Sequence, residues 1–329
     1  MKNILVTGGA GFIGGQACFS LIDLGYNIFI IDNLSTGSDK FLPKNVKFFK
    51  EDLKNIDSVN AIFKNNDFDA VLHFASSIKN DESTVEPLNY YKNNTINTLN
   101  LLENMVKYNI KNLIFSSSAS VYGDQNINRE KFKENTPTNP LTPYGYSKMF
   151  SERFIIDICS KEKINAIILR YFNVAGADLK YRTGQITNNS DHLIKVICKY
   201  LTGKLEKLCV FGNNYNTNDG TCIRDYLHVQ DLINAHLLSL NYLLKSKNNF
   251  VEIFNCGSQN GYSVFEVIRQ TEQIIQNKIA FSIEKRRKGD PESLVADSSK
   301  IKKMLGWKIK YDLNRIISDS LNWEKKIKT

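Results

Sequence analysis

The stretch "TGGAGFIGG", residues 7–15, comes directly after the apolar run "NILV" and opens a segment with helical periodicity. Its glycines Gly8, Gly11 and Gly14 form the pattern GxxGxxG. In a strand–loop–helix unit, the first glycine permits a tight turn, the second lets the backbone approach a pyrophosphate, and the third lets the helix pack on the strand. The helix N-terminus then offers free N–H groups and a positive dipole end to phosphates. The stretch therefore predicts a dinucleotide-binding loop.

The next apolar run strengthens this prediction. The run "NIFIID" (27–32) ends in Asp32, eighteen residues beyond Gly14. A carboxylate at this place accepts hydrogen bonds from the ribose diol of adenosine and repels a 2′-phosphate, so the sequence predicts NAD rather than NADP. Asp52 follows the third apolar run and is a candidate for contact with the adenine amine.

The first half of the chain alternates short apolar runs with segments of 3.6-residue periodicity. Near-continuous apolar strands between helices indicate a parallel sheet covered on both faces. The expected strands are 3–7, 27–32, 46–50, 70–75, 112–117 and 165–172. Beyond residue 172 the pattern is irregular, with loops rich in Asn, Gly and Thr. We predict an α/β fold, a Rossmann-type doubly wound sheet in a cofactor domain (1–172) and a smaller α/β substrate domain (173–329), partly interleaved with it.

Composition narrows the choice of partners. The net charge is +9, but lysines are scattered among Asn and Glu, which favours a solvated basic surface with a basic tail, "EKKIKT", over a nucleic-acid site. No run approaches the ~20 apolar residues of a membrane span, and the chain is expected to lack a secretory signal. The six cysteines form no CxxC pair, and the four histidines show no metal-ligand spacing. These features predict a cytoplasmic protein with reduced thiols and no metal.

The stretch "PLTPYGYSKMFSE" (140–152) sets two tyrosines ahead of one lysine. Pro143 suits the start of a helix. Residues four apart share a helix face and residues two apart lie nearly opposite, so Tyr144 pairs with Lys148 and Tyr146 points away. A tyrosine has a pKa near ~10, and lowering it by about three units needs ~4 kcal/mol. One positive charge ~4 Å away supplies about that much at an effective dielectric of ~20. Lys148, helped by a positive nicotinamide ring and opposed by desolvation, would make Tyr144 a base.

The stretch "FSSSASVYGD" (115–124) leaves the fifth expected strand at its carboxyl end. Ligands bind at this edge of open α/β sheets. A serine hydroxyl here can hydrogen-bond the same substrate oxygen that Tyr144 deprotonates. Serines are common in turns, but the glycine loop upstream and the Tyr–Lys pair downstream favour a functional role.

Taken together, these motifs resemble the extended short-chain dehydrogenase/reductase family and, within it, the UDP-glucose (UDP-galactose) 4-epimerases. The resemblance spans nearly the whole chain. It is carried by "TGGAGFIG", "IDNLSTG", "VLHFA", "PLNYYKNNTINTLNLLE", "FSSSASVYG", "PYGYSK", "LRYFNVAGA", "VFGNNYNTNDGTCIRDYLHVQDL", "FNCG" and "RRKGDP". The pair "RYFNVAGA" and "DGTCIRDYLHV" is the most specific to the epimerases.

The resemblance implies a role for each matching residue. The implied catalytic set is Ser118, Tyr144 and Lys148. The implied cofactor site comprises Gly8, Gly11, Phe12, Ile13, Gly14, Asp32, Asn33, Leu34, Ser35, Thr36, Gly37, Asp52, Leu53, Phe74, Ala75, Asn94, Tyr144, Lys148 and Phe172. The implied UDP-sugar site comprises Ser118, Ser120, Tyr144, Asn173, His192, Leu193, Val210, Phe211, Arg224, Arg287, Asp290 and Leu294. Guanidinium groups suit a diphosphate, and Asp290 suits a ribose diol.

Three positions depart from the family pattern. Where some members place a lysine near the pyrophosphate, this chain has Ile78, with Lys79 beside it, which leaves open whether Lys79 substitutes. A family glycine is replaced by Asn97, expected on a helix surface. Leu294 stands where members restricted to unacetylated sugars often have tyrosine, so it indicates either room for a 2-N-acetyl group or ordinary packing.

The resemblance implies a redox-neutral epimerisation of UDP-glucose and UDP-galactose, with UDP-N-acetylhexosamines as further candidates. Tyr144 takes the proton of the sugar 4-hydroxyl while the C4 hydride passes to tightly held NAD. The 4-keto sugar then turns over, tethered by its UDP, and regains hydride on its other face. The alternatives are a UDP-N-acetylglucosamine-specific 4-epimerase, a 4,6-dehydratase, for which "SSSASVYG" lacks an acid–base carboxylate pair, a net dehydrogenase, and a non-catalytic NAD-binding module.

Assembly is the last expectation from the sequence. Helices near 88–107 and 147–162 carry apolar residues on more than one face. The residues concerned are Leu99, Leu102, Met105, Phe150, Phe154 and Ile158. They indicate either a homodimer joined by a four-helix seam, as the resemblance implies, or packing within one chain.

Overall fold

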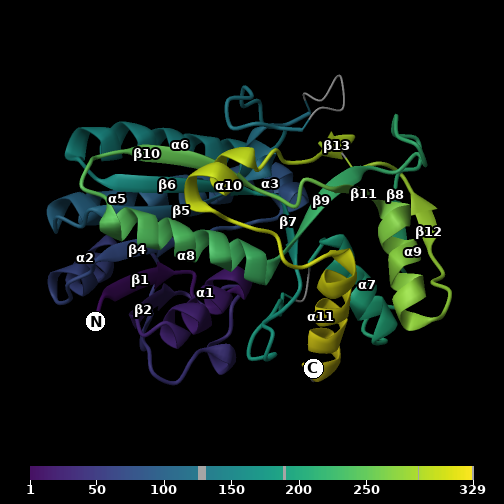
Figure 1. The fold of residues 1–329 in the computed structure, drawn as a ribbon, viewed down its shortest axis with the longest axis horizontal. Coiled ribbons are helices and arrows are strands. Elements are labelled where there is room, and N and C mark those ends of the chain that lie inside the picture. The colour runs from purple at the N-terminus through teal and green to yellow at the C-terminus, as the bar shows by residue number, and fades with distance from the viewer. Residues whose placement is uncertain (125–130, 188–189, 288, 328–329) are drawn as a thin grey trace.

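A computed structural model describes residues 1–124, 131–187, 190–287 and 289–327. Lys288 of the "RRKGDP" motif and the last two residues of the basic tail lie outside the described residues. In this structure a large layered body carries a smaller one at the end away from the N-terminus (Figure 1).

A seven-stranded sheet, parallel throughout, forms the centre of the large body. In spatial order its strands are β10 (Val251–Cys256), β6 (Asn165–Tyr171), β5 (Asn112–Ser118), β4 (Ala70–His73), β1 (Asn3–Thr7), β2 (Asn27–Asp32) and β3 (Lys47–Lys50). The connections reverse direction between β1 and β4, the switch point of a doubly wound sheet. The predicted Rossmann-type α/β class is confirmed.

The strands begin and end close to their expected positions, with one addition. β4 ends at His73, two residues before the expected end, although the amide of Phe74 still donates to the carbonyl of Thr7 at 3.0 Å. β10 comes from the second half of the chain and pairs with β6 along its whole length. The larger sheet therefore includes residues beyond 172.

Helices cover both faces of this sheet (Figure 1). Alternate residues of a strand point to opposite faces, so Ile4 and Val6 of β1 pack on one side and Leu5 on the other. One layer contains α1 (Phe12–Asp23), α8 (Val229–Lys245) and α10 (Ser299–Leu305). The other contains α2 (Ile56–Lys64), α5 (Asn97–Lys107) and α6 (Pro143–Glu162).

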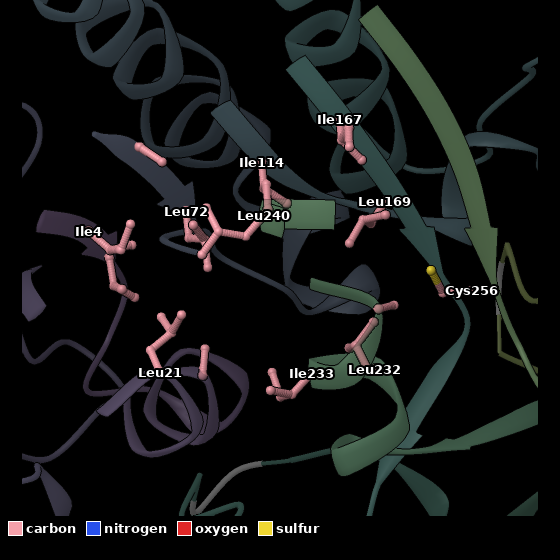
Figure 2. Packing of buried hydrophobic residues seen from close by; sticks show 14 of the residues in the cluster. Ile4, Leu21, Leu72, Ile114, Ile167, Leu169, Leu232, Ile233, Leu240 and Cys256 are labelled. Carbon is pink, nitrogen blue, oxygen red and sulfur yellow. The ribbon is translucent and has the colours of Figure 1, made fainter. Parts of the chain in front are cut away.

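The layer that contains α8 explains why this helix, from the second half of the chain, packs on the large body. Figure 2 shows Leu21 of α1 and Leu232, Ile233 and Leu240 of α8 directed toward the apolar side chains of the strands. Each of these side chains is almost fully buried. Burying a leucine or isoleucine is worth about 1.5–3 kcal/mol, so α8 belongs energetically to the sheet and not to the smaller body.

The smaller body is built from short strands and three helices around its own apolar cluster. Its strands are β7 (Asn173–Ala175), β8 (Cys209–Phe211), β9 (Ile223–His228), β11 (Gly261–Ser263), β12 (Ser282–Glu284) and β13 (Ser293–Leu294). Its helices are α7 (Leu193–Leu201), α9 (Val264–Ile275) and α11 (Leu313–Lys326). β9 is its central strand, pairing with β7, β11 and β13.

Short elements complete the connections near the carboxyl edge of the large sheet. They are η1 (Asp39–Phe41), α3 (Asn80–Val85), α4 (Pro87–Tyr90), the π-helical turn η2 (Tyr91–Ile96) and η3 (Ala119–Val121). α4, η2 and α5 follow one another without a break, so the π turn lies inside a continuous helical segment.

Candidate active site

A cavity of about 1080 Å³ lies along the carboxyl edge of the large sheet and extends to the strands of the smaller body. Its volume exceeds that of a typical pocket for one small ligand. Most of the site residues predicted from the sequence line it. They are Gly8, Gly11, Phe12, Ile13, Gly14, Asp32, Asn33, Ser35, Thr36, Asp52, Leu53, Phe74, Ala75, Ser118, Ser120, Tyr144, Phe172, Asn173, His192, Leu193, Val210, Phe211, Arg224, Arg287, Asp290 and Leu294.

The glycine loop is shaped as the sequence predicts. Gly8 has a φ of +73°, and a side chain there would begin 2.6 Å from the amide nitrogen of Ala75. A Cβ on Gly14 would overlap the carbonyl of Gly8, so α1 can approach the loop only with glycine at this position. Gly11 lines the cavity, and a Cβ there would lie 3.3 Å from the carbonyl oxygen of Gly8, so glycine leaves the backbone free for contact with a phosphate.

Asp32 ends β2 with its carboxylate held in place by the backbone. One oxygen accepts from the amide of Ala10 at 2.9 Å and the other from the amide of Leu34 at 2.8 Å. Burial raises the pKa of Asp32, and these two hydrogen bonds act in the opposite direction. Each oxygen keeps a further lone pair, so the carboxylate fits the ribose diol of a dinucleotide.

Four of the predicted site residues lie just behind the cavity wall. Gly37 packs against the backbone of Ala10, and Leu34 adopts a φ of 59° beside Asp32. Asn94 is buried and connects the wall to α6, because its amide accepts from the backbone of Ser77 at 2.8 Å and donates to the hydroxyl of Ser147 at 2.9 Å. The fourth is Lys148.

The catalytic candidates lie on regular elements. Ser118 is the last residue of β5, and Tyr144 lies in the first turn of α6, after the capping residue Thr142. Tyr144 lines the cavity, whereas Tyr146 stacks against Phe150 with ring centroids 6.1 Å apart. The α6 backbone therefore separates the two tyrosines as helical spacing predicts.

The electrostatics of Tyr144 differ from the sequence-based expectation. Burial raises its pKa to about 12, and a hydrogen bond with Ser118 offsets this only in part, while Asp191 raises it further. The protein groups alone therefore oppose the phenolate, because desolvation outweighs the attraction that we expected from Lys148. A lowered pKa would need the positive charge of a bound nicotinamide.

Lys148 is buried one helical turn after Tyr144. Its ammonium donates to the carbonyl of Ser116 at 2.8 Å and lies 5.0 Å from the centre of the Phe115 ring. Burial lowers the pKa of Lys148 to about 7, and the charge of Glu152 acts in the opposite direction. The charge on this lysine therefore depends closely on its surroundings near neutral pH.

The charged residues at the other end of the cavity pair across it. Arg224 of β9 makes an ion pair with Asp290 and also donates to the carbonyl of Ile223 at 2.8 Å. Arg287 stacks over the ring of Phe211 at 4.1 Å, and its Nε lies 3.9 Å from a carboxylate oxygen of Asp81. These cations are the groups that could bind a diphosphate.

The remaining candidates surround this end. His192 precedes α7, and its Nδ1 lies 3.3 Å from the side-chain amide of Gln185. Leu294 of β13 lies opposite Arg224 in the pairing with β9. Leu294 is buried among apolar side chains and still forms part of the cavity wall.

Sequence reasoning misjudged or missed several residues. The expectation that Asn97 lies on a helix surface is wrong, because its side chain is buried and forms part of the cavity wall. The π-helical turn immediately before it adds a residue and changes which face it occupies. Lys79, Tyr171 and Asp191 also line the cavity. A sequence signal existed for Lys79 alone, through its place beside Ile78.

Across the described ranges, no group of three His, Cys, Asp or Glu side chains could hold a metal ion. In the same part of the chain, every helix is too short or too polar to cross a bilayer.

This fold and site define a class of protein. A doubly wound sheet, a dinucleotide loop, a Ser–Tyr–Lys set and, at the other end of the same cavity, a pair of arginines are together characteristic of short-chain dehydrogenase/reductase enzymes that act on nucleotide-linked substrates. Residues 4–257 match the NAD dependent epimerase/dehydratase family, and the chain belongs to that family. This confirms the resemblance and the prediction of NAD as cofactor.

Similar proteins of known name support the assignment. A UDP-glucose 4-epimerase of Azospirillum brasilense is 42% identical over 325 residues, which are 98% of this chain and 92% of the relative. The structure of UDP-glucose 4-epimerase from Bifidobacterium longum in complex with NAD+ and UDP has a TM-score of 0.93 and 36% identity, covering 99% of this chain and 98% of that one. The UDP-Glc/GlcNAc 4-epimerase of Campylobacter jejuni has a TM-score of 0.83 and 40% identity, covering 99% and 100%.

Proposed function

We propose that this protein is an NAD-dependent UDP-glucose 4-epimerase, which interconverts UDP-glucose and UDP-galactose. The observation that carries the proposal is the cavity itself. It joins a dinucleotide loop, a buried tyrosine beside a serine, and two arginines in one continuous space. A reaction that oxidises and then reduces the same carbon needs the first two features, and recognition of a nucleotide diphosphate needs the third.

The cofactor would occupy the end formed by the large sheet. Gly11 and the start of α1 would face the pyrophosphate, and Asp32 the adenosine ribose. Asn33 and Asp52, joined by a hydrogen bond of 2.9 Å, border the same end. NAD, when bound, supplies the hydride acceptor and donor for C4 of the sugar.

The catalytic residues would handle the proton. Tyr144 accepts it from the sugar 4-hydroxyl, and Ser118 hydrogen-bonds the same oxygen. Lys148 lies one turn behind the tyrosine, and its ammonium form would favour the phenolate as the positive nicotinamide does. When the sugar has turned over and C4 is reduced on its opposite face, Tyr144 returns the proton to the 4-oxygen.

The UDP part would be held by the smaller body. Arg224 and Arg287 suit the diphosphate, and Asp290 suits the ribose diol. Asn173, His192, Leu193, Val210 and Phe211 complete this wall. Because recognition rests on the nucleotide, the sugar is free to present either face to the cofactor. We propose that residues 1–172 mainly bind NAD and residues 173–329 mainly bind UDP-sugar. The exceptions are α8, α10 and β10, which belong structurally to the NAD-binding part.

The decisive experiment is incubation of the purified protein with UDP-galactose and without added NAD. We expect UDP-glucose as the product, at equilibrium with the substrate and without net NADH. A stable 4-keto-6-deoxy product would identify a dehydratase. Accumulation of NADH would identify a net dehydrogenase, and no turnover would leave an NAD-binding module.

The range of sugars is a finer proposal, that the protein also accepts UDP-N-acetylhexosamines. A leucine in the cavity wall occupies less volume than a tyrosine, and the similar protein from Campylobacter jejuni is named for both Glc and GlcNAc. We expect Leu294→Tyr to lower kcat/KM for UDP-N-acetylgalactosamine roughly 10-fold or more, and that for UDP-galactose much less. Equal losses for both sugars would indicate that Leu294 is a packing residue.

We further propose a cytoplasmic homodimer. All six cysteines have free thiols, which favours a reducing compartment. Of the apolar residues expected at a seam, Leu102 and Met105 are buried in the core of the chain itself. Phe150 of α6 and Ile96 of η2 remain exposed on neighbouring elements and suit contact with a second copy.

A further inference from the structure

A buried ion pair lies behind the catalytic candidates. Glu152 of α6 follows Lys148 by one helical turn, and its side chain is only 4% exposed. Arg170 of β6, 5% exposed, reaches it with two nitrogens, the shorter contact being 2.6 Å from Nη2 to Oε2. The hydroxyl of Ser117 donates to the other carboxylate oxygen at 2.5 Å. The mechanism above uses none of these three groups.

The far side of Arg170 is also fully engaged. Its Nη1 donates to the hydroxyl of Tyr122 at 3.1 Å and to the carbonyl of Glu134 at 3.2 Å. The hydroxyl of Tyr122 donates in turn to Asn255 of β10 at 2.7 Å. The pair is therefore fixed between β5, α6, β6 and β10, and its charges cannot move away from Lys148.

Lys148 has few other charged neighbours. On its own helix the charged neighbour is Glu152, one turn after it, while Tyr144, one turn before it, is a neutral phenol; on β5 it contacts the Ser116 carbonyl and the Phe115 ring. His73 of β4 is also within electrostatic reach, but burial, and then Lys148 itself, lower the pKa of His73 to about 3, so it is neutral. Glu152 is therefore the anion next to Lys148, and Arg170 is a second cation that interacts with the same carboxylate.

We propose that Glu152 and Arg170 are positioning residues that together set the charge of Lys148. Glu152 stabilises the ammonium of Lys148. Arg170 limits this effect, because its positive charge pairs with the same carboxylate and partly cancels the attraction that Lys148 experiences. The inference rests on the proposed function, because the charge of Lys148 matters to catalysis only if Tyr144 is the base. Burial leaves Lys148 close to its titration point at neutral pH, so small changes in this balance alter the charged fraction.

The two partners have opposite expected effects. Glu152→Gln leaves two buried cations without an anion, so Lys148 should lose its proton at a pH lower by roughly one unit. Arg170→Met removes the competing cation, so Lys148 should keep its proton to a pH higher by a similar amount. A purely structural role would not reverse the sign between these variants.

The test measures the titration of Lys148 directly in the full chain with its NAD. Lysine labelled with 13C and 15N is followed by NMR across pH, and Lys148→Met identifies the resonance. Arg153→Gln is the matched control, because Arg153 pairs with Asp157 on the exposed side of the same helix. We expect the midpoint to fall in Glu152→Gln, rise in Arg170→Met, and stay unchanged in the control.

A second readout is the pH dependence of kcat for UDP-galactose. Activity needs the charge on Lys148, so the alkaline limb should move in the same two directions. A midpoint that does not move, or that moves opposite to the expected direction, would overturn the inference, and either folded variant suffices for this. The NMR titration does not depend on turnover, so an inactive protein with shifted midpoints would contradict the proposed function alone.

Discussion

Near Tyr144 the charged side chains are buried and form an ion pair with each other, whereas at the other end of the cavity the charged side chains line the cavity wall. We call the first group the sealed end and the second the cavity end. Glu152 and Arg170 are 4% and 5% exposed. In the cavity wall Arg224 is 9% exposed, but Asp290 and Arg287 are 27% and 28% exposed and Asp81 is 57% exposed. The sealed pair spans regular helix and strand. Of the cavity pairs, only Arg224 lies within a long strand, and its partner Asp290 lies in a loop.

This difference in burial suits two different tasks, which are proton transfer at the sealed end and binding of an anion at the cavity end. Groups that act on a developing charge must keep their geometry, because reorganisation would add to the barrier. Groups that bind an anion must instead exchange one negative partner for another. Arg224 and Arg287 each face a carboxylate that a diphosphate would replace or join. Substitutions at the sealed end should therefore affect kcat, and those at the cavity end should affect binding of UDP.

The largest expected effect is at Tyr144. Tyr144→Phe removes the hydroxyl that exchanges the proton and preserves the ring, so kcat should fall by roughly 10²–10⁴-fold. The affinity for UDP, measured by calorimetry, should remain within about 2-fold, because Tyr144 is expected to contact the sugar and not the UDP.

Tyr146→Phe is the matched control two residues away. Tyr146 stacks on Phe150 outside the cavity, and its loss of a hydroxyl should leave kcat nearly unchanged. Comparable losses in both variants would mean that α6 is disturbed as a whole. Near-normal activity of Tyr144→Phe would remove the tyrosine from the mechanism.

A smaller effect, of the opposite kind, is expected at Arg224. Arg224→Gln loses a charge-assisted contact worth about 1.5–3 kcal/mol, so Kd for UDP should rise roughly 10- to 100-fold while kcat at saturation changes little. Arg269→Gln is the control, because Arg269 is an exposed arginine of α9 with only a 4.0 Å contact to Asp219. A fall in kcat without a change in Kd would contradict the division of tasks.

Features that depend on local periodicity could be predicted from the sequence, whereas features that depend on tertiary contacts could not. The strands, the glycine loop and the choice of Tyr144 over Tyr146 depend on local periodicity, which the sequence displays directly. Asn97 depends on a π turn that periodicity of 3.6 does not anticipate. The raised pKa of Tyr144 follows from burial by distant segments. The return of β10 to the large sheet, and the pairing of Asp81 with Arg287, are likewise set by tertiary contacts between residues far apart in the sequence.

The smallest expected effect is at Asp81, which tests the cavity end without touching a proposed ligand contact. Asp81 competes for Arg287 across a 3.9 Å gap, and exposed pairs of this kind are worth about 0–1 kcal/mol. Asp81→Asn should therefore strengthen UDP binding by at most about 5-fold, leave kcat unchanged, and steepen the rise of Kd with salt, because the release of the arginine by screening no longer offsets the screening of its attraction to UDP.

Asp157→Asn is the control for Asp81→Asn, since it removes an equally exposed carboxylate from α6 outside the cavity. It should leave Kd for UDP unchanged, which separates a local effect on Arg287 from a general change in the charge of the protein. Weaker UDP binding in Asp81→Asn would mean that the carboxylate orients Arg287 for the diphosphate instead of competing with it. The cavity end would then be pre-organised like the sealed end, and the contrast between them would lie in exposure alone.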